Sequence, residues 1–331
     1  MTMATQKKKN NNNKILLPFE KPLEALYDKL EELRAIQEEG KMPMTAETGL
    51  LEKRIEAARG KIFSNLNPTQ IVQVARHLLR PTMLDYVNLI CEDFVELHGD
   101  RNFADDPALV TGIANFNGRS VVVIGHQKGH STKENIARRF GMPNPEGYRK
   151  ALRVMRLAER YGKPIISLVD TPGAYPGIGA EERGQAEAIA KNLREMAELT
   201  VPFVTVITGE GGSGGALGIA MGNRVLMLEY ATYAVISAEG CASILFNDAK
   251  RAPEMAVAMK ITAKDLLELK VCDEIIKEPL GGAHNDPALA AKNIKAAVIK
   301  HLEPLLSLSH RELIADRYNK FRKMGIFNEG D

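Results

Sequence analysis

The chain has 331 residues, of which 44% are hydrophobic and 26% are charged, a composition typical of globular rather than disordered proteins. Its 44 Lys and Arg residues nearly balance 42 Asp and Glu residues, so no overall charge attracts it to nucleic acid or an anionic membrane. Its three cysteines, Cys91, Cys241 and Cys272, form no C-x-x-C pair. This argues against a disulfide framework or a thiolate zinc site, predicts no metal site, and favours a reducing compartment.

The N-terminal part of the chain predicts a tail followed by helices. Residues 1–17 begin with a Lys- and Asn-rich tract unlike a secretory signal, and we expect a disordered tail there. Over residues 18–59, two stripes of apolar residues at helical spacing predict a helical hairpin, which packs on the protein itself or contacts a partner chain. We assign residues 18–82 to an N-terminal helical extension. No uninterrupted apolar run reaches about 18 residues, so we expect no membrane span and a cytoplasmic protein.

The pattern over residues 83–331 is that of one α/β domain. A helix is predicted over residues 84–97, because a capping pattern precedes apolar residues at helical spacing. Asn117-Gly118 then predicts a tight turn between two strands, residues 108–116 and 120–125.

Apolar strands alternate with amphipathic helices through the rest of this domain. The further strands are predicted over residues 164–169, 203–207, 225–228, 234–236 and 271–276. A helix is expected over residues 181–199, and residues 287–322 are expected to be mostly helical. This alternation predicts an α/β fold in which helices cover buried strands.

One glycine-rich loop is the most informative segment of the chain. Its residues are Gly209-Glu210-Gly211-Gly212-Ser213-Gly214-Gly215-Ala216. So many glycines indicate an unusual backbone conformation or a close approach of the backbone to another group. A dinucleotide-binding turn, a nucleophile elbow, an oxyanion hole and a packing turn without chemistry all fit this loop.

The first two interpretations depend on short patterns. Gly209, Gly211 and Gly214 fit G-x-G-x-x-G, with Glu229 about 20 residues further on, as at a dinucleotide site. A nucleophile elbow would instead centre on Ser213, with Asp273 and His284 following in the order of a hydrolase. In an oxyanion hole, backbone N–H groups point at an oxygen that becomes negative during the reaction.

A second loop, Asp170–Gly177, directly follows the predicted strand over residues 164–169 and is also rich in glycine and proline. Ligands of parallel α/β sheets bind beyond the carboxyl ends of the strands. We therefore expect the two loops to face one cleft, which favours a binding or catalytic site over a simple turn.

Both loops resemble those of the carboxyltransferase alpha subunit of bacterial and plastid acetyl-CoA carboxylase. The resemblance extends over about residues 18–301 and departs from the family at Leu78 and Ala238, where the family usually has proline. The segments that carry it are Asp170–Gln185, Gly209–Ala216, His98–Arg101, Gly125–Gly129, Thr132–Asn135 and Pro279–His284.

This resemblance implies a crotonase-like (ClpP/crotonase) fold of repeated ββα units for residues 83–331. It also implies transfer of the carboxyl group of carboxybiotin to acetyl-CoA, giving malonyl-CoA in the first committed step of fatty acid synthesis. The biotin would be attached to a biotin carboxyl carrier protein and not to this chain. A beta subunit would carry zinc and bind the CoA ester, with two alpha and two beta chains expected. Biotin carboxylase would complete this ATP-binding complex, in the cytoplasm or the plastid stroma.

The resemblance also implies roles for particular residues. Gly214 and Gly215 would donate their backbone N–H groups to the ureido oxygen of carboxybiotin. The residues expected to shape the carboxybiotin and CoA cleft are Gly173, Ala174, Gly211, Gly212, Ala216 and Lys128. Lys128 also lies in a basic, glycine-flanked segment after a predicted strand, which suggests either a contact with a phosphate group or the carrier protein, or a solvated basic face. A catalytically silent scaffold for the other subunits is the alternative.

Overall fold

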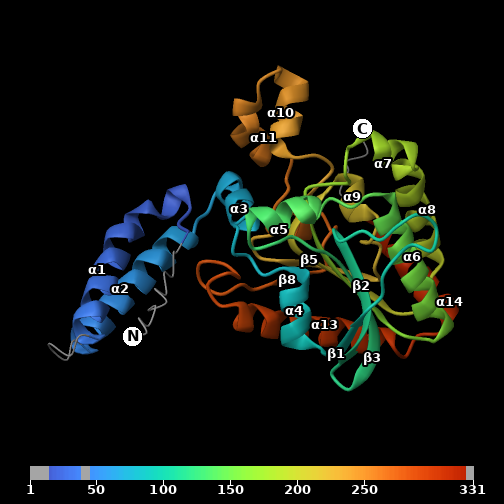
Figure 1. Cartoon of the computed structure of the whole chain (residues 1–331), viewed down its shortest axis with the longest axis horizontal. Helices are drawn as coiled ribbons and strands as arrows, with labels where there is room; N and C mark the ends of the chain where they lie inside the picture. The colour runs from blue at the N-terminus through green and yellow to red at the C-terminus, as the bar shows by residue number, and fades with distance from the viewer. Residues whose placement is uncertain (1–14, 39–44, 326–331) are drawn as a thin grey trace, which may run out of the picture. The chain divides into compact units, whose positions relative to one another are not determined.

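The structure is a computed structural model that describes residues 15–38 and 45–325 (Figure 1). The chain divides into two compact units, residues 1–62 and residues 63–331. The domain boundary expected after residue 82 therefore lies inside the second unit. Most of the predicted disordered tail, residues 1–14, lies outside the described residues.

The first unit contains the predicted helices. They are η1 Pro18–Leu23, α1 Glu24–Glu38 and α2 Thr45–Phe63, whose last residue belongs to the second unit. Leu23 and Leu30 from the first part of the unit are buried in one apolar cluster with Leu51 and Ile55 of α2. The apolar stripes seen in the sequence are therefore the surfaces through which these helices pack together.

The second unit is built on one eight-stranded sheet with the order β1-β2-β3-β4-β5-β6-β8, and β7 pairs with β5. β1, β2 and β3 are antiparallel neighbours, whereas every pairing from β3 onward is parallel. The strands are β1 Glu92–Glu96, β2 Leu109–Phe116, β3 Arg119–His126, β4 Ile165–Thr171, β5 Phe203–Gly212, β6 Arg224–Leu228, β7 Thr232–Ala234 and β8 Glu274–Ile276.

Helices cover both sides of this sheet. In Figure 1, α6 and α8 lie together on one side of the sheet, and α4 and α13 lie together on the other. None of the described helices is both long and apolar enough to cross a membrane. The helices of the second unit are α3 Pro68–Ala75, α4 Met83–Ile90, α5 Thr132–Ala137, η2 Arg139–Gly141, α6 Pro145–Arg160, α7 Ile178–Glu182, α8 Gln185–Glu198, α9 Ser213–Leu217, α10 Ala238–Phe246, η3 Ala249–Arg251, α11 Ala252–Ala258, α12 Ala263–Glu268, α13 Pro287–Leu305 and α14 His310–Arg322.

The hairpin and the buried central strands confirm the sequence analysis. Asn117 and Gly118 have φ angles of 53° and 78° and join β2 to β3, as expected for a two-residue turn with left-handed residues. All of β4 is buried, and so is β5 up to Gly211. Strands of a parallel sheet are buried on both faces, which explains their continuous apolar sequences.

The helix predicted over residues 84–97 is wrong beyond Ile90. Cys91 adopts an extended conformation, and the next residues form β1 at the edge of the sheet. Phe94, whose spacing from Cys91 suggested a helix, instead covers Gly112 of β2, where a methyl group would collide with the aromatic ring. Pairing with β2 therefore overrides the helical periodicity.

Three other predicted boundaries also need correction. The helix expected over residues 181–199 is interrupted at Gly184, whose φ of 82° is left-handed and separates α7 from α8. The strand expected over residues 234–236 lies at Thr232–Ala234, where it pairs with the end of β5. The strand expected over residues 271–276 is confined to Glu274–Ile276, where the pairing with β6 occurs.

Leucine-to-alanine substitutions should separate core from surface in the second unit. Leu228 of β6 is fully buried, whereas Leu245 of α10 is 63% exposed. Leu228→Ala should lower the free energy of unfolding by about 3 kcal/mol, because it leaves a cavity in the core. Leu245→Ala should change it by less than about 1 kcal/mol. Urea unfolding of the two variants measures the difference, and equal losses would contradict this description of the core.

Candidate functional site

The two glycine-rich loops meet through their backbones. A methyl group on Gly212 would collide with the carbonyl group of Pro172, and one on Gly215 would collide with the backbone of Gly173 and Ala174. Glycine is therefore required at both positions of the second loop. The structure thus brings together Gly173, Ala174, Gly212 and Gly215, as the sequence analysis expected.

The chain turns sharply where β5 leads into α9. Ser213, the first residue of α9, has a φ of 53°, and this helix is only five residues long. The first N–H groups of a helix have no partner within it, so those of Gly214 and Gly215 are available to an acceptor. Ser213 and Gly214 also line a mainly apolar cavity of about 530 Å³. A negatively charged oxygen at this turn would meet backbone donors.

The expected glycines differ in accessibility. Gly215 and Ala216 are buried, and Gly211 lies against Tyr233, where a methyl group would be 2.7 Å from the ring. An added methyl group on Gly214 would meet nothing closer than Ile189, at 3.6 Å. Within this single chain, Gly214 is therefore the more accessible of the two predicted donors.

A network of charges lies beside the loops, at the ends of β4 and β5. The Lys128 ammonium is 2.7 Å from Asp170 Oδ1 and 3.0 Å from Glu210 Oε2. Arg76, which follows α3, lies 2.5 Å from Glu210 Oε1 and 2.7 Å from Glu239 of α10. The charge of Lys128, predicted to contact a substrate or a carrier protein, is thus already paired within the chain.

The pairing keeps these buried groups charged. Burial alone would raise the pKa of the Glu210 carboxyl, but Lys128 and Arg76 hold it below its usual range. Burial would likewise lower the pKa of Lys128, but Asp170 and Glu210 raise it. The Asp170 carboxylate also accepts the Glu210 N–H at 2.9 Å, which joins the ends of β4 and β5 directly.

This network includes residues to which the sequence analysis gave no role. Arg76, Lys128, Pro172 and Glu210 line a cavity of about 380 Å³ next to the loops. Arg76 and Glu210 are 134 positions apart, and no motif connects them. Only the fold brings these residues together.

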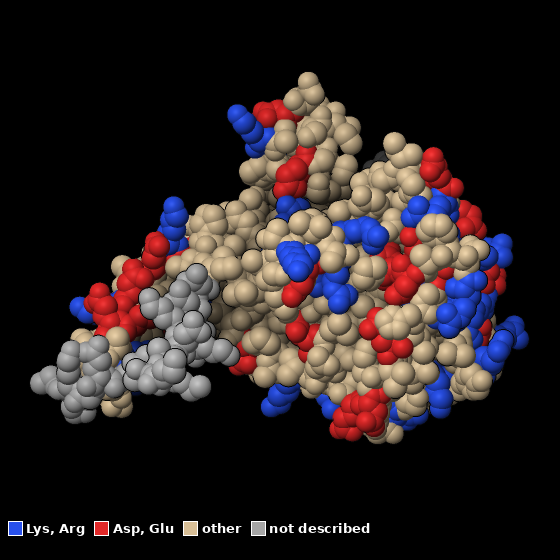
Figure 2. Space-filling model, in the orientation of Figure 1, with Lys and Arg blue, Asp and Glu red and all other residues tan. Residues whose placement is uncertain are grey.

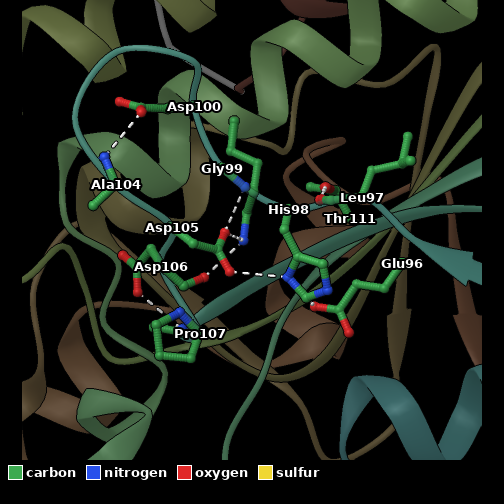
Figure 3. A network of polar contacts seen from close by, with 12 residues as sticks. Glu96, Leu97, His98, Gly99, Asp100, Ala104, Asp105, Asp106, Pro107 and Thr111 are labelled. Atoms are coloured by element: carbon green, nitrogen blue, oxygen red, sulfur yellow. Dashed lines mark hydrogen bonds and ion pairs between the residues drawn. The ribbon is translucent and has the colours of Figure 1, made fainter.

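A second polar network, shown in Figure 3, holds the segment between β1 and β2. Asp105 accepts hydrogen bonds from the N–H of Gly99 at 2.8 Å and from the ammonium of Lys150 at 2.6 Å, and lies 3.0 Å from His98 Nδ1. Burial would raise the pKa of Asp105, but Lys150 and Gly99 lower it well below its usual range. The motif that begins at His98 is thus a structural element of the fold.

The contacts of the loop weaken two alternatives. Glu229, the expected ribose partner of a dinucleotide, accepts hydrogen bonds from Lys277 and from the N–H of Glu278. Asp273 accepts a hydrogen bond from the N–H of Val225 and forms an ion pair with Lys320, and His284 stacks on His77, with ring centroids 3.7 Å apart. Neither a ribose site nor a catalytic triad results from these contacts.

No group of three or more His, Cys, Asp or Glu residues in the described part of the chain is arranged to hold a metal ion. Lys, Arg, Asp and Glu side chains are mixed over the visible face of the second unit in Figure 2. The candidate site therefore consists of backbone N–H groups beside a network of paired charges.

Alanine substitutions should distinguish the glycines. Gly212→Ala and Gly215→Ala should each lower the free energy of unfolding by about 1 to 3 kcal/mol, because the methyl group forces the loops apart. Gly214→Ala should change it by less than about 1 kcal/mol, since only ordinary contacts form. Urea unfolding measures all three, and a Gly214→Ala loss as large as the others would contradict the observed loop packing.

Lys128→Met should change how stability depends on pH. In the native protein the pKa of Glu210 is lower than its ordinary value of 4.5. This difference stabilises the folded state at every pH above 4.5, and the stabilisation is lost as the pH falls through the lowered pKa. Without Lys128, only Arg76 opposes the effect of burial, so the pKa of Glu210 should be higher than in the native protein, and the variant should lack part of this stability at pH values above 4.5. We expect a deficit of about 3 kcal/mol at neutral pH, shrinking in acid. The exposed Lys133→Met is the control, and a pH-independent deficit would contradict the prediction.

Comparison with known proteins places the chain in a family. Residues 16–325 match the family described as acetyl co-enzyme A carboxylase carboxyltransferase-like. A relative from Geobacter metallireducens is 60% identical, over 95% of this chain and 98% of the relative. One from Thermus thermophilus is 56% identical, over 95% and 99%. Both are named acetyl-coenzyme A carboxylase carboxyl transferase subunit alpha.

Solved structures confirm the predicted crotonase-like α/β fold. A transcarboxylase 12S structure has a TM-score of 0.54 and 24% identity, over 72% of this chain but only 45% of that longer chain. A Pseudomonas malonate decarboxylase hetero-tetramer has a TM-score of 0.55 and 15% identity, over 66% of this chain and 88% of the other. Together with the family match over residues 16–325, this shows that the chain belongs to the acetyl-CoA carboxylase carboxyltransferase-like family.

Proposed function

We propose that this chain is the alpha subunit of a carboxyltransferase that transfers the carboxyl group of N-carboxybiotin to acetyl-CoA. The product would be malonyl-CoA, in the first committed step of fatty acid synthesis. The observation that carries the proposal is the turn from β5 into α9, whose N–H groups lie beside the loop at Gly173 in a chain so similar to named alpha subunits. The chain would act in the cytoplasm, or in the plastid stroma of a plastid-bearing organism.

The proposed mechanism needs no protein nucleophile. Carboxybiotin releases its carboxyl group as carbon dioxide while negative charge develops on its ureido oxygen. Its freed nitrogen takes a methyl proton from acetyl-CoA, and the resulting enolate attacks the carbon dioxide to form the new carbon–carbon bond of malonyl-CoA. The N–H groups of Gly214 and Gly215 would stabilise that oxygen more strongly in the transition state than in the ground state. Gly173 and Ala174 would form the opposite wall, and the paired Lys128 would hold Asp170 and Glu210 in place.

The arrangement leaves other tasks to partner chains. A beta subunit would bind the CoA ester and carry zinc, and a biotin carboxyl carrier protein would deliver biotin charged by biotin carboxylase. We propose two alpha and two beta chains. The supporting observation is exposed apolar surface: Val235 and Ile178 are 79% and 80% exposed, and Ile244 on α10 is 75% exposed. In Figure 2 the projection formed by α10 and α11 shows mostly uncharged surface on this face, with charged side chains along one edge and at its base.

The test is carboxyl transfer in reverse, from malonyl-CoA to biocytin, by this chain alone and mixed with a cognate beta subunit. We expect activity only in the mixture. Gly214→Val should lower kcat about 100-fold or more, because its side chain blocks access to the donors. Ser213→Gly, which keeps the positive φ, should retain activity within about twofold, because the hydroxyl has no chemical role.

Assembly controls separate the alternatives. If Gly214→Val assembles normally and remains fully active, the chain is a scaffold and the oxyanion assignment fails. If Ser213→Gly is inactive in an intact complex, the serine hydroxyl takes part and a nucleophilic mechanism replaces the one proposed.

A further inference from the structure

The short helix α9 leaves one of its carbonyl groups without a backbone partner. In a regular helix, the N–H of Ile219 would bond to the carbonyl of Gly215. Here the N–H of Ile219 instead donates to the carbonyl of Ala216 at 3.2 Å, and the N–H of Gly218 donates to the carbonyl of Gly214 at 2.9 Å. Because the last turn is tighter, none of these backbone N–H groups donates to the carbonyl of Gly215. This carbonyl points into the protein interior and needs another donor.

Tyr148 of α6 supplies that donor. Its hydroxyl donates to the Gly215 carbonyl at 3.3 Å, and its side chain is fully buried. The ring also lies against Gly218, where a methyl group would be 2.7 Å from two ring carbons. Burial raises the pKa of Tyr148 well above its usual range, so the hydroxyl keeps its proton. Asn192 also connects α6 to the end of α9, because its side-chain amide donates hydrogen bonds to the carbonyls of both Tyr148 and Gly218.

His126, the last residue of β3, lies next to the same carbonyl. It is 1% exposed, and neither ring nitrogen makes a hydrogen bond of normal geometry with the described residues. Burial lowers the pKa of His126 to about 3, although the Gly215 carbonyl acts in the opposite direction. The ring is therefore neutral at physiological pH and carries one N–H. A carbonyl oxygen can accept two hydrogen bonds, so Gly215 has room for both donors.

We propose that Tyr148 and His126 are positioning residues that hold the Gly215 carbonyl from the interior and thereby aim the N–H groups of Gly214 and Gly215. This inference rests on the proposed function. Neither side chain would touch a reacting atom. Both contacts are looser here than ordinary hydrogen bonds, and catalytic contacts commonly tighten when substrate and partners bind.

The α9 helix needs such an anchor because it is short. A five-residue helix has too few internal hydrogen bonds to fix its own orientation. Oxyanion donors act only when they point at the place where charge develops, and a loose supporting shell weakens them. Since Tyr148 and His126 both remain uncharged at physiological pH, the anchor would not change over the pH range of an assay.

The test uses Tyr148→Phe in the complex with the beta subunit. This variant keeps the ring against Gly218 and removes only the hydroxyl. In reverse transfer, kcat should fall about fivefold or more, with KM for biocytin and for malonyl-CoA unchanged. The matched control is Tyr86→Phe, because Tyr86 is also fully buried but its hydroxyl has no hydrogen-bond partner among the described residues. The control should retain the activity of the unmodified complex.

His126 provides the second variant. His126→Phe should lower kcat in the same way, and His126→Asn, which keeps a side-chain N–H, should recover part of the loss. Amide hydrogen exchange over residues 214–217 gives a readout that does not depend on activity. It should become faster in Tyr148→Phe and His126→Phe and remain unchanged in Tyr86→Phe.

The outcomes separate this inference from the proposed function. An unmodified complex without carboxyl transfer would overturn the proposed function itself. An active complex in which Tyr148→Phe and His126→Phe match Tyr86→Phe in kcat and in exchange would overturn only the positioning role. A rise in KM for biocytin at constant kcat would also overturn it, because it would indicate direct contact with the substrate.

Discussion

The backbone contact between two loops is the constraint on which the rest of the site depends. Gly212 and Gly215 have no side chains because the chain at Pro172 to Ala174 occupies that space. This contact joins the ends of β4 and β5 and sets the direction in which α9 begins. The sheet beneath is rigid because its central parallel strands are buried on both faces. A rigid base and a fixed turn are what preorganised backbone donors require.

Buried charge reinforces the same geometry. Lys128 connects Asp170 at the end of β4 to Glu210 at the end of β5, and Arg76 extends the connection to Glu239 of α10. Breaking such a pair would leave a buried charge without a partner, so the network favours one arrangement of these elements over others. The site thus combines paired side-chain charges with the backbone N–H groups at the start of α9, and those N–H groups suit a reaction whose negative charge develops on the substrate.

Sequence predicted what depends on local patterns. The turn at Asn117-Gly118 and the buried strands could be recognised because their signals lie within a few residues. The segment after Ile90 could not, because Phe94 has helical spacing from Cys91 and only pairing with β2 makes it a strand. The glycines of the site were recognised as a group through family resemblance. Their different accessibility, the partners of Lys128 and the contact of Tyr148 with Gly215 all arise from residues far apart in the chain.

The central claim is that the N–H groups at the start of α9 bind the oxygen that becomes negative. The most direct measurement is the amide proton chemical shift of Gly214 and Gly215 in the alpha–beta complex, labelled with ¹⁵N and titrated with biotin. The account predicts downfield shifts at these two amides, larger than those of other glycines near the loops, as hydrogen bonds to the ureido oxygen form. If saturating biotin changes the chemical shifts of other residues but leaves those of both amides unchanged, the central claim is contradicted.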